Sequence, residues 1–133
     1  MTKRLLWLLL FLPVWTISCF GANSVLIHPG EVIYVRFTQN KLKLKVVSAT
    51  KEKDEQAQVI MSLEPVVSGQ DHITLKVVNK FTSDLHYKAE MRAPSKDLSL
   101  IIPVSLVVAE RLALEKLAPT IEEVYLFGFG LEK

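Results

Sequence analysis

The chain has 133 residues, of which 50% are hydrophobic and 8% aromatic. Its 16 Lys and Arg residues stand against 14 Asp and Glu, so the formal net charge is only +2. This balance excludes a general electrostatic attraction for nucleic acid or anionic lipid. We therefore expect no nucleic-acid partner.

The first 21 residues have the pattern of a secretory signal peptide. Lys3 and Arg4 precede thirteen uncharged residues, 5–17. This run has the length of a signal-peptide core and is shorter than the roughly 20 residues of a membrane-spanning helix. Pro13 would also disturb such a helix. The sequence predicts a signal peptide over 1–21 and a periplasmic or secreted protein, with a retained membrane anchor as the alternative.

Cys19 is the only cysteine, and two processing routes are open to it. Cleavage after Gly21 would remove Cys19 with the signal peptide. Alternatively, Thr16-Ile17-Ser18-Cys19 resembles a lipobox, in which Cys19 would be lipidated and would anchor the protein at a membrane. We expect the soluble form, and membrane association only if Cys19 is lipidated.

The remaining chain, residues 22–133, is long enough for one domain with its own core. Removing Lys3 and Arg4 leaves 14 basic and 14 acidic residues, so the mature domain is neutral. No disulfide can form within it, because the lone cysteine lies before it. Core packing alone must therefore hold the fold.

Alternation of apolar and polar residues is the dominant pattern of this domain. It runs through residues 41–46, 72–78 and 85–92. Successive side chains of a strand point to opposite faces, so each run predicts a strand with one buried face. Four further runs are richer in apolar residues and are typical of central or two-sided strands: 31–38, 57–64, 98–108 and 121–131.

Turn-forming residues separate these runs, including His28-Pro29-Gly30 and the charged stretch 51–56. Residues 110–117 have good helix formers followed by Pro119, which predicts a short helix or helical turn. Proline cannot donate to a ladder, so Pro103 is expected at a strand end, an edge or a bulge. About seven strands at this spacing predict an all-β fold, an immunoglobulin-like antiparallel β-sandwich over 22–133. A small barrel is the alternative.

Two segments resemble known bacterial domains. Residues 75–91 resemble a hairpin of secreted immunoglobulin-like domains, in which an apolar strand ends in Asn and the return strand carries Leu-x-Tyr-x-Ala. Residues 121–129 are similar to the final strand of small periplasmic proteins of this type. The resemblance implies the sandwich fold and carries no information on activity.

Residues 29–34 resemble the opening of periplasmic pilus-assembly chaperones, which have Arg-Val-Ile-Tyr at that point. In that family the arginine helps to hold the carboxylate of a pilin subunit. Glu31 occupies the matching position here with the opposite charge. The family also has two domains, whereas this chain has room for one. A chaperone-like assembly factor is therefore retained only as an alternative function.

Residue types that carry catalysis or bind metals are present without the spacing that such sites need. His28, His72 and His86 show no metal-ligand spacing, and there is no nucleophile elbow, P-loop or dinucleotide motif. We expect a protein that is not an enzyme and has no metal or cofactor. Gly128-Phe129-Gly130 predicts a β-bulge or a close approach of another backbone.

Two groups of side chains are the candidate partner surface. A lysine face would place ammonium groups about 7 Å apart along one strand, either as a guarded, solvated face or as a docking surface for an acidic partner. An aromatic group lies near the end of the chain. The residues are Lys41, Lys43, Lys45, Tyr125, Phe127 and Phe129.

The pattern favours a non-enzymatic binding or assembly module of the bacterial cell envelope. We expect it to contact another envelope protein through sheet edges, for instance by β-augmentation. The alternative is a small-ligand or lipid carrier of the periplasm, with a pocket between the sheets.

Overall fold

The computed structural model describes residues 23–133, so Cys19 and the predicted signal peptide lie outside the described residues. Within that range the chain forms nine strands and one 3-10 helix, η3 (Pro94–Lys96). The strands are β1 (Ser24–Ile27), β2 (Val32–Asn40), β3 (Lys43–Thr50), β4 (Val59–Glu64), β5 (Ile73–Asn79), β6 (Leu85–Ala93), β7 (Leu98–Val107), β8 (Leu112–Leu117) and β9 (Glu123–Leu131). None of the helices in this range is long and apolar enough to cross a membrane.

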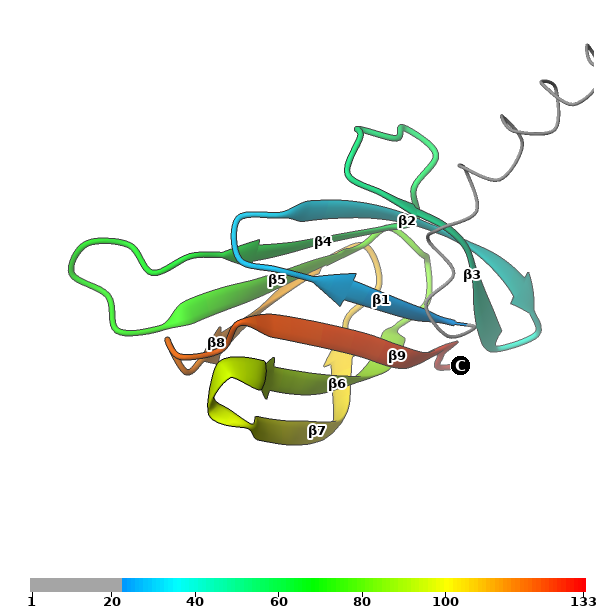
Figure 1. Cartoon of the computed structure of the whole chain (residues 1–133). Helices are drawn as coiled ribbons and strands as arrows, with labels where there is room; N and C mark the ends of the chain where they lie inside the picture. Colours follow the sequence, from blue (N-terminus) through cyan, green and yellow to red (C-terminus); the bar gives the residue numbers. More distant parts are fainter. Residues whose placement is uncertain (1–22) are drawn as a thin grey trace, which may run out of the picture.

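All strand pairs are antiparallel and belong to one sheet with the order β7-β6-β9-β3-β2-β4-β5-β8, and β1 pairs with β9. The sheet curls into a half-barrel, with β7 and β8 at its two ends (Figure 1). The predicted all-β antiparallel fold is confirmed. The more specific immunoglobulin-like sandwich stays a prediction.

The core lies inside the curl and follows from the alternation along each strand. On β4, for example, Val59, Met61 and Leu63 are buried, while Ile60 and Ser62 on the other face are only partly covered. Burial of such side chains stabilises the fold by about 1.5–3 kcal/mol each. The largest fully buried side chains are Tyr87, Ile27, Met61, Leu63, Leu75, Leu85 and Leu126.

The sheet consists of two halves that share a single backbone pairing. One half is β7-β6-β9-β1 and the other is β3-β2-β4-β5-β8. Between them, β3 and β9 pair only at Lys43 and Gly130. The amide of Leu131 also donates to the carbonyl of Leu42 at 2.7 Å. The junction therefore lies at one end of both strands.

Strand β1 lies where β3 and β9 diverge, and Asn23 attaches its start to β3. The Asn23 side chain donates from Nδ2 to the Leu44 carbonyl at 3.0 Å and accepts from the Val46 amide at 2.7 Å. These bonds satisfy β3 backbone groups that face no paired strand on that side. A segment of only four residues, too short for an alternation pattern, is thereby held between the halves.

The glycines near the end of β9 have the role that the sequence predicted. His86 pairs with Gly130 and Lys88 pairs with Phe127, so two residues of β9 face one residue of β6 in a bulge. Gly128 has φ +64° at this bulge, a conformation that glycine adopts without strain. At Gly130 a Cβ atom would lie 2.5 Å from Nε2 of His86 and 3.2 Å from the carbonyl oxygen of Leu42. Both the bulge and the close approach are confirmed.

The helix predicted over 110–117 is wrong. Residues Leu112–Leu117 form β8, which pairs with β5 residue by residue. Ala113, Glu115 and Leu117 face the core side, opposite buried residues of β5, while Leu112 and Leu114 face outward. Helix propensity amounts to a few tenths of a kcal/mol per residue, and the tertiary pairing with β5 outweighs it.

The other predicted strands are present, with two differences in connection. Strands β5 and β6 do not form a hairpin, because β5 pairs with β4 and β8, and β6 pairs with β7 and β9. The turn between β2 and β3 lies at Lys41 and Leu42, so β3 begins two residues after the start of the predicted run 41–46. Lys41 has φ +57° in this turn.

Asn79, at the end of β5, holds the crossing from one half to the other. Its side chain is almost fully buried. Nδ2 donates to the carbonyls of Ser83 at 2.9 Å and Val107 at 3.1 Å, and Oδ1 accepts from the Phe81 amide at 2.9 Å. One amide group thus satisfies backbone groups of the β5–β6 connection and of β7.

Replacing Asn79 by Ala should lower the free energy of unfolding by about 1–3 kcal/mol, because buried backbone groups lose their partners. Urea denaturation followed by circular dichroism measures this change. Asn40→Ala, at the exposed end of β2, is the control and should change stability by less than about 0.5 kcal/mol. Equal stability of the two variants would contradict the role given to Asn79.

Candidate functional site

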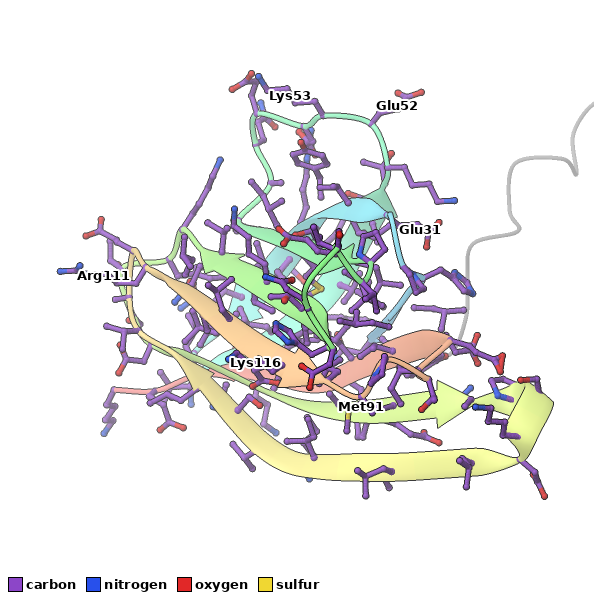
Figure 2. All side chains as sticks on the ribbon, turned by 90° about the vertical axis from the view of Figure 1, so that its left-hand side faces the viewer. Glu31, Glu52, Lys53, Met91, Arg111 and Lys116 are labelled. Atoms are coloured by element: carbon purple, nitrogen blue, oxygen red, sulfur yellow. The ribbon has the colours of Figure 1, made fainter. Side chains whose placement is uncertain are left out.

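Strand β7 lies at one end of the strand order and has a free edge. It has ten residues and, in the described part of the chain, pairs only with β6. Figure 2 shows it along the rim of the molecule, with β6 on one side and no strand beyond it. Residues 98–108 carry no charge. Long uncharged edges are the places where another strand adds to a sheet.

The first half of β7 exposes apolar side chains on its inward face. Leu98 pairs with Ala93 and Leu100 pairs with Met91, and both partners on β6 are buried. Directly opposed residues point to the same face of a sheet, so Leu98 and Leu100 face inward. They are nevertheless 57% and 63% exposed. The core therefore stops short of this part of β7.

The inward face becomes covered toward the other end of β7. Ser105 and Val107 pair with Tyr87 and Leu85, and both are buried. On the outward face, Ile101, Val104 and Leu106 are all more than half exposed. Residues 98–101 thus lack cover on both faces, whereas Ile102 is partly buried and packs against the core.

A bulge separates the two halves of β7. Tyr87 pairs with Ser105 and Ala89 with Ile102, so β7 has one residue more than β6 at Pro103. Proline donates no backbone hydrogen bond. Its position in an edge strand at a bulge is confirmed. Residues 98–102 are consequently one uninterrupted segment of five.

The other edge strand, β8, also exposes apolar residues, but on the outer face. Leu112 pairs with Val78 and Leu114 with Lys76, and Leu114 is 61% exposed. The lysine and the partly covered valine make this patch more mixed than that of β7. Strand β7 differs from β8 because it has no charged residue and exposes apolar side chains on both faces.

Glu115, on the inward side of β8, has a buried carboxylate oxygen. Oε1 accepts a hydrogen bond from the Tyr87 hydroxyl at 3.4 Å, and Oε2 is buried without a hydrogen-bond partner. Burial raises the pKa of Tyr87, and the nearby Glu115 carboxylate adds to the rise. A buried carboxylate oxygen without a hydrogen-bond partner lowers stability.

Two of the three predicted lysines share a strand face. Lys43 and Lys45 are exposed on β3, on either side of buried Leu44. Lys41 lies in the preceding turn instead. Strands β9 and β6 lie between β3 and β7 in the sheet order, so this lysine face is separate from the β7 edge.

The predicted aromatic surface requires a correction. Tyr125 and Phe127 are partly exposed on the outer face of β9, whereas Phe129 is only 5% exposed. Its ring packs in the core, with its centroid 5.0 Å from that of Phe37 and 6.5 Å from that of Tyr87. The bulge at Gly128 shifts the alternation by one residue and turns Phe129 inward. Phe129 is therefore not part of a partner surface.

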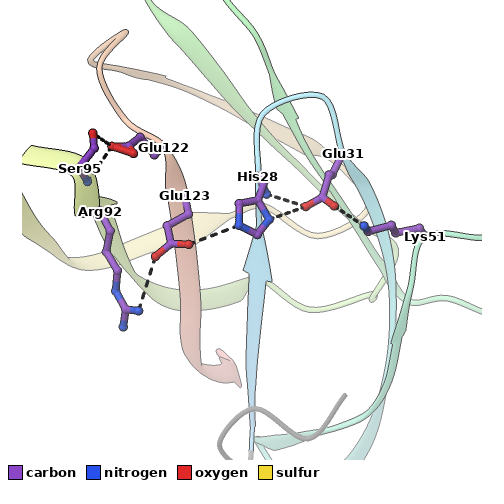
Figure 3. A network of polar contacts seen from close by, with 7 residues as sticks. All are labelled: His28, Glu31, Lys51, Arg92, Ser95, Glu122 and Glu123. Carbon is purple, nitrogen blue, oxygen red and sulfur yellow. Dashed lines mark hydrogen bonds and ion pairs between the residues drawn. The ribbon is translucent and has the colours of Figure 1, made fainter. Parts of the chain in front are cut away.

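A chain of polar contacts crosses between the two halves at the end opposite the Lys43–Gly130 junction (Figure 3). Nδ1 of His28 lies 3.0 Å from Oε1 of Glu31, and Nε2 lies 3.3 Å from Oε2 of Glu123. Nζ of Lys51 lies 2.5 Å from Oε2 of Glu31. On the β6 side, Nη1 of Arg92 lies 3.8 Å from Oε1 of Glu123. The chain thus runs from β6 to the end of β3.

This polar chain continues beside β7. Arg92 contacts Glu90 at 3.1 Å and lies over the ring of Tyr125, 4.6 Å from its centroid. Ser99 of β7 donates to Glu90 at 2.6 Å. Hydrogen bonds from Arg92, then from Ser99, lower the pKa of Glu90. A charged and aromatic margin therefore lies next to the apolar edge.

Unlike His28, which lies between two carboxylates, His72 and His86 each contact one. Nδ1 of His72 lies 3.4 Å from Asp71, and Nδ1 of His86 lies 2.9 Å from Glu132. Residues 23–133 contain no group of three or more His, Cys, Asp and Glu side chains that could hold a metal ion. The comparisons with protein-family models, curated proteins and solved structures give no match.

Acid should destabilise the domain, and Glu31 should account for part of the loss. Burial raises the pKa of Glu31, but hydrogen bonds from Lys51 and His28 outweigh it and hold the pKa below its usual 4.5. A lowered native pKa contributes stability above the unfolded-state pKa and loses it as the pH falls through the native pKa. The free energy of unfolding should therefore fall as the pH drops below about 4.5.

Urea denaturation at pH 7 and at pH 3 measures this loss. Glu31→Gln should be less stable at pH 7 by up to about 1 kcal/mol and should lose less on acidification than the unmodified protein. Glu52→Gln, in the exposed loop after β3, serves as the control. If Glu31→Gln shows the unmodified pH dependence, Glu31 does not contribute to it.

Proposed function

We propose that the mature domain is a non-enzymatic protein-binding module of the bacterial cell envelope. In this proposal a partner adds an extended strand to the free edge of β7, next to residues 98–102. The observation that supports it is an uncharged edge segment in which Leu98 and Leu100 on the inner face and Ile101 on the outer face are more than half exposed. The signal-peptide pattern of residues 1–21 supports the envelope location.

An extended polypeptide strand fits this edge better than a compact small molecule does. It would pair with unpaired backbone groups of β7 and cover Leu98 and Leu100 on the inner face and Ile101 on the outer face. The adjoining margin of Glu90 and Arg92 adds polar contacts at the rim, the arrangement that protein interfaces have.

The strength of the contact follows from the exposed side chains. Complete burial of a leucine or isoleucine contributes about 1.5–3 kcal/mol, and more than half of each side chain remains to be covered here. Three such residues give several kcal/mol, similar to the 4–15 kcal/mol or so that association costs. Backbone pairing and rim contacts must supply the rest, so we expect a reversible contact rather than a permanent one.

Site-specific photo-crosslinking in the native host tests this function. A photoreactive residue at Ile101 should form adducts with another envelope protein, because this side chain lies on the outer face of the edge. The same residue at Glu52, in a loop far along the sheet order from β7, should not. Addition of Leu100→Lys should abolish the adducts from position 101. Absence of any adduct from position 101 would overturn the proposal.

A small-ligand carrier is the second candidate, and one pocket favours it. A cavity of about 290 Å³ lies between β1 and β2–β3, where the strands diverge. Val25, Leu26 and Ile33 give it apolar walls, and Glu31 and Lys51 lie at its margin. This size suits a short acyl chain rather than a large cofactor.

Thermal denaturation with medium-chain fatty acids tests the carrier function. A ligand that binds only the native state raises the melting temperature, by several degrees at a concentration of about 100 times Kd. Ala49→Phe should fill the pocket and remove the shift while keeping the fold. A panel of acyl ligands without any shift would argue against a carrier.

A further inference from the structure

We infer that β7 also pairs with β7 of a second copy of this chain, antiparallel about a two-fold axis at Leu100. This inference rests on the proposed function, because it names an occupant for the same edge. Three features support it: the register of the segment, its lack of charge and the bulge that ends it.

The register is self-complementary. An axis at Leu100 places Leu98 opposite Ile102 of the other copy and Leu100 opposite its own equivalent. Leu98 and Leu100 face inward, and Ile102 pairs with buried Ala89 of β6 and so faces inward too. Opposed residues share a face, so all inward side chains meet inward side chains. A shift of one residue would oppose inward to outward side chains and is excluded.

The absence of charge allows two identical β7 segments to pair without electrostatic repulsion. A two-fold interface brings the residues near its axis close to their own copies, and like charges directly opposed are destabilising. Residues 98–108 contain no charge. The nearest charged residues, Lys96 and Asp97, would lie beside Val104 and Pro103 of the other copy and not beside each other. In this pairing no charged residue of β7 or of residues 96–97 therefore lies opposite a like charge.

Pro103 and the bulge limit the pairing to one segment. The proline has no N–H to continue a ladder, and β7 changes its alternation at this point. The contact would therefore close as a dimer of five residue pairs. An interface of this size lies below the roughly 1,600 Å² of standard complexes, so we expect monomer at low protein concentration and dimer at high concentration.

Sedimentation velocity of the mature protein, secreted from the full chain, measures the association. The mass should double as the concentration rises from about 1 µM toward about 1 mM. Leu100→Lys would place two ammonium groups at the axis and should keep the protein monomeric. Leu114→Lys is the matched control, because Leu114 on β8 is as exposed as Leu100; this variant should still dimerise.

Cysteine crosslinking tests the register. Directly opposed Cβ atoms in an antiparallel pair lie about 4.5–5.5 Å apart, close to the reach of a disulfide. Under mild oxidation Leu100→Cys should form covalent dimers, whereas Leu114→Cys should not. Circular dichroism of both variants shows whether the fold is kept.

The outcomes separate this inference from the proposed function. Concentration-dependent dimers that Leu100→Lys abolishes support the second copy. A protein that stays monomeric up to the highest concentration, or a dimer that survives Leu100→Lys, overturns it. If a monomeric protein still forms adducts from position 101 with a different envelope protein, the second copy is wrong and the proposed function stands. If neither dimers nor adducts form, both are wrong.

Discussion

The architecture depends on one backbone pairing, between Lys43 of β3 and Gly130 of β9. Gly130 cannot carry a side chain without displacing His86 and meeting the Leu42 carbonyl, so this close approach constrains the sequence. Since the two halves pair only there, β3 and β9 diverge along the rest of their length. Strand β1 and the contacts from His28 to Glu31 and Glu123 join the halves beyond that point. The sheet can therefore curl around its core, which leaves β7 and β8 as edges.

The edge position of β7 conflicts with its composition. Residues 98–108 have the uncharged, apolar sequence of a strand with neighbours on both sides, but within residues 23–133 β7 pairs with β6 alone. Natural sequences usually agree with their position in the fold, and departures concentrate at functional sites. Exposed edges also carry lysines, prolines or bulges that prevent uncontrolled pairing. In β7 only the second half has such a device, at Pro103, which leaves residues 98–102 open.

Much of the fold could be predicted from local sequence, because alternation reports which residues share a face. Alternation located three of the strands and apolar-rich runs located four more, and the glycines of β9 indicated both the bulge and the close approach. The pairing partners could not be predicted, because they depend on contacts distant in sequence: β8 pairs with β5 despite its helix-forming residues, and β5 and β6 separate into different halves. The site was missed for the same reason. The sequence 98–108 indicated a two-sided strand, and only the sheet order shows that one side is free. A one-residue bulge turned Phe129 from the predicted surface into the core.

Hydrogen exchange at the amides of residues 98–102 tests the central claim, that the free edge of β7 is a site for strand addition, most directly. The mature protein would be compared at low concentration and in its assembled state, whether with a second copy or with a captured envelope partner. We predict that the amides of this segment on the unpaired edge, away from β6, exchange rapidly in the dilute protein and are protected on assembly. Amides of β8 should keep their exchange rates. Assembly that leaves residues 98–102 in rapid exchange would contradict the claim and would direct the search to another surface.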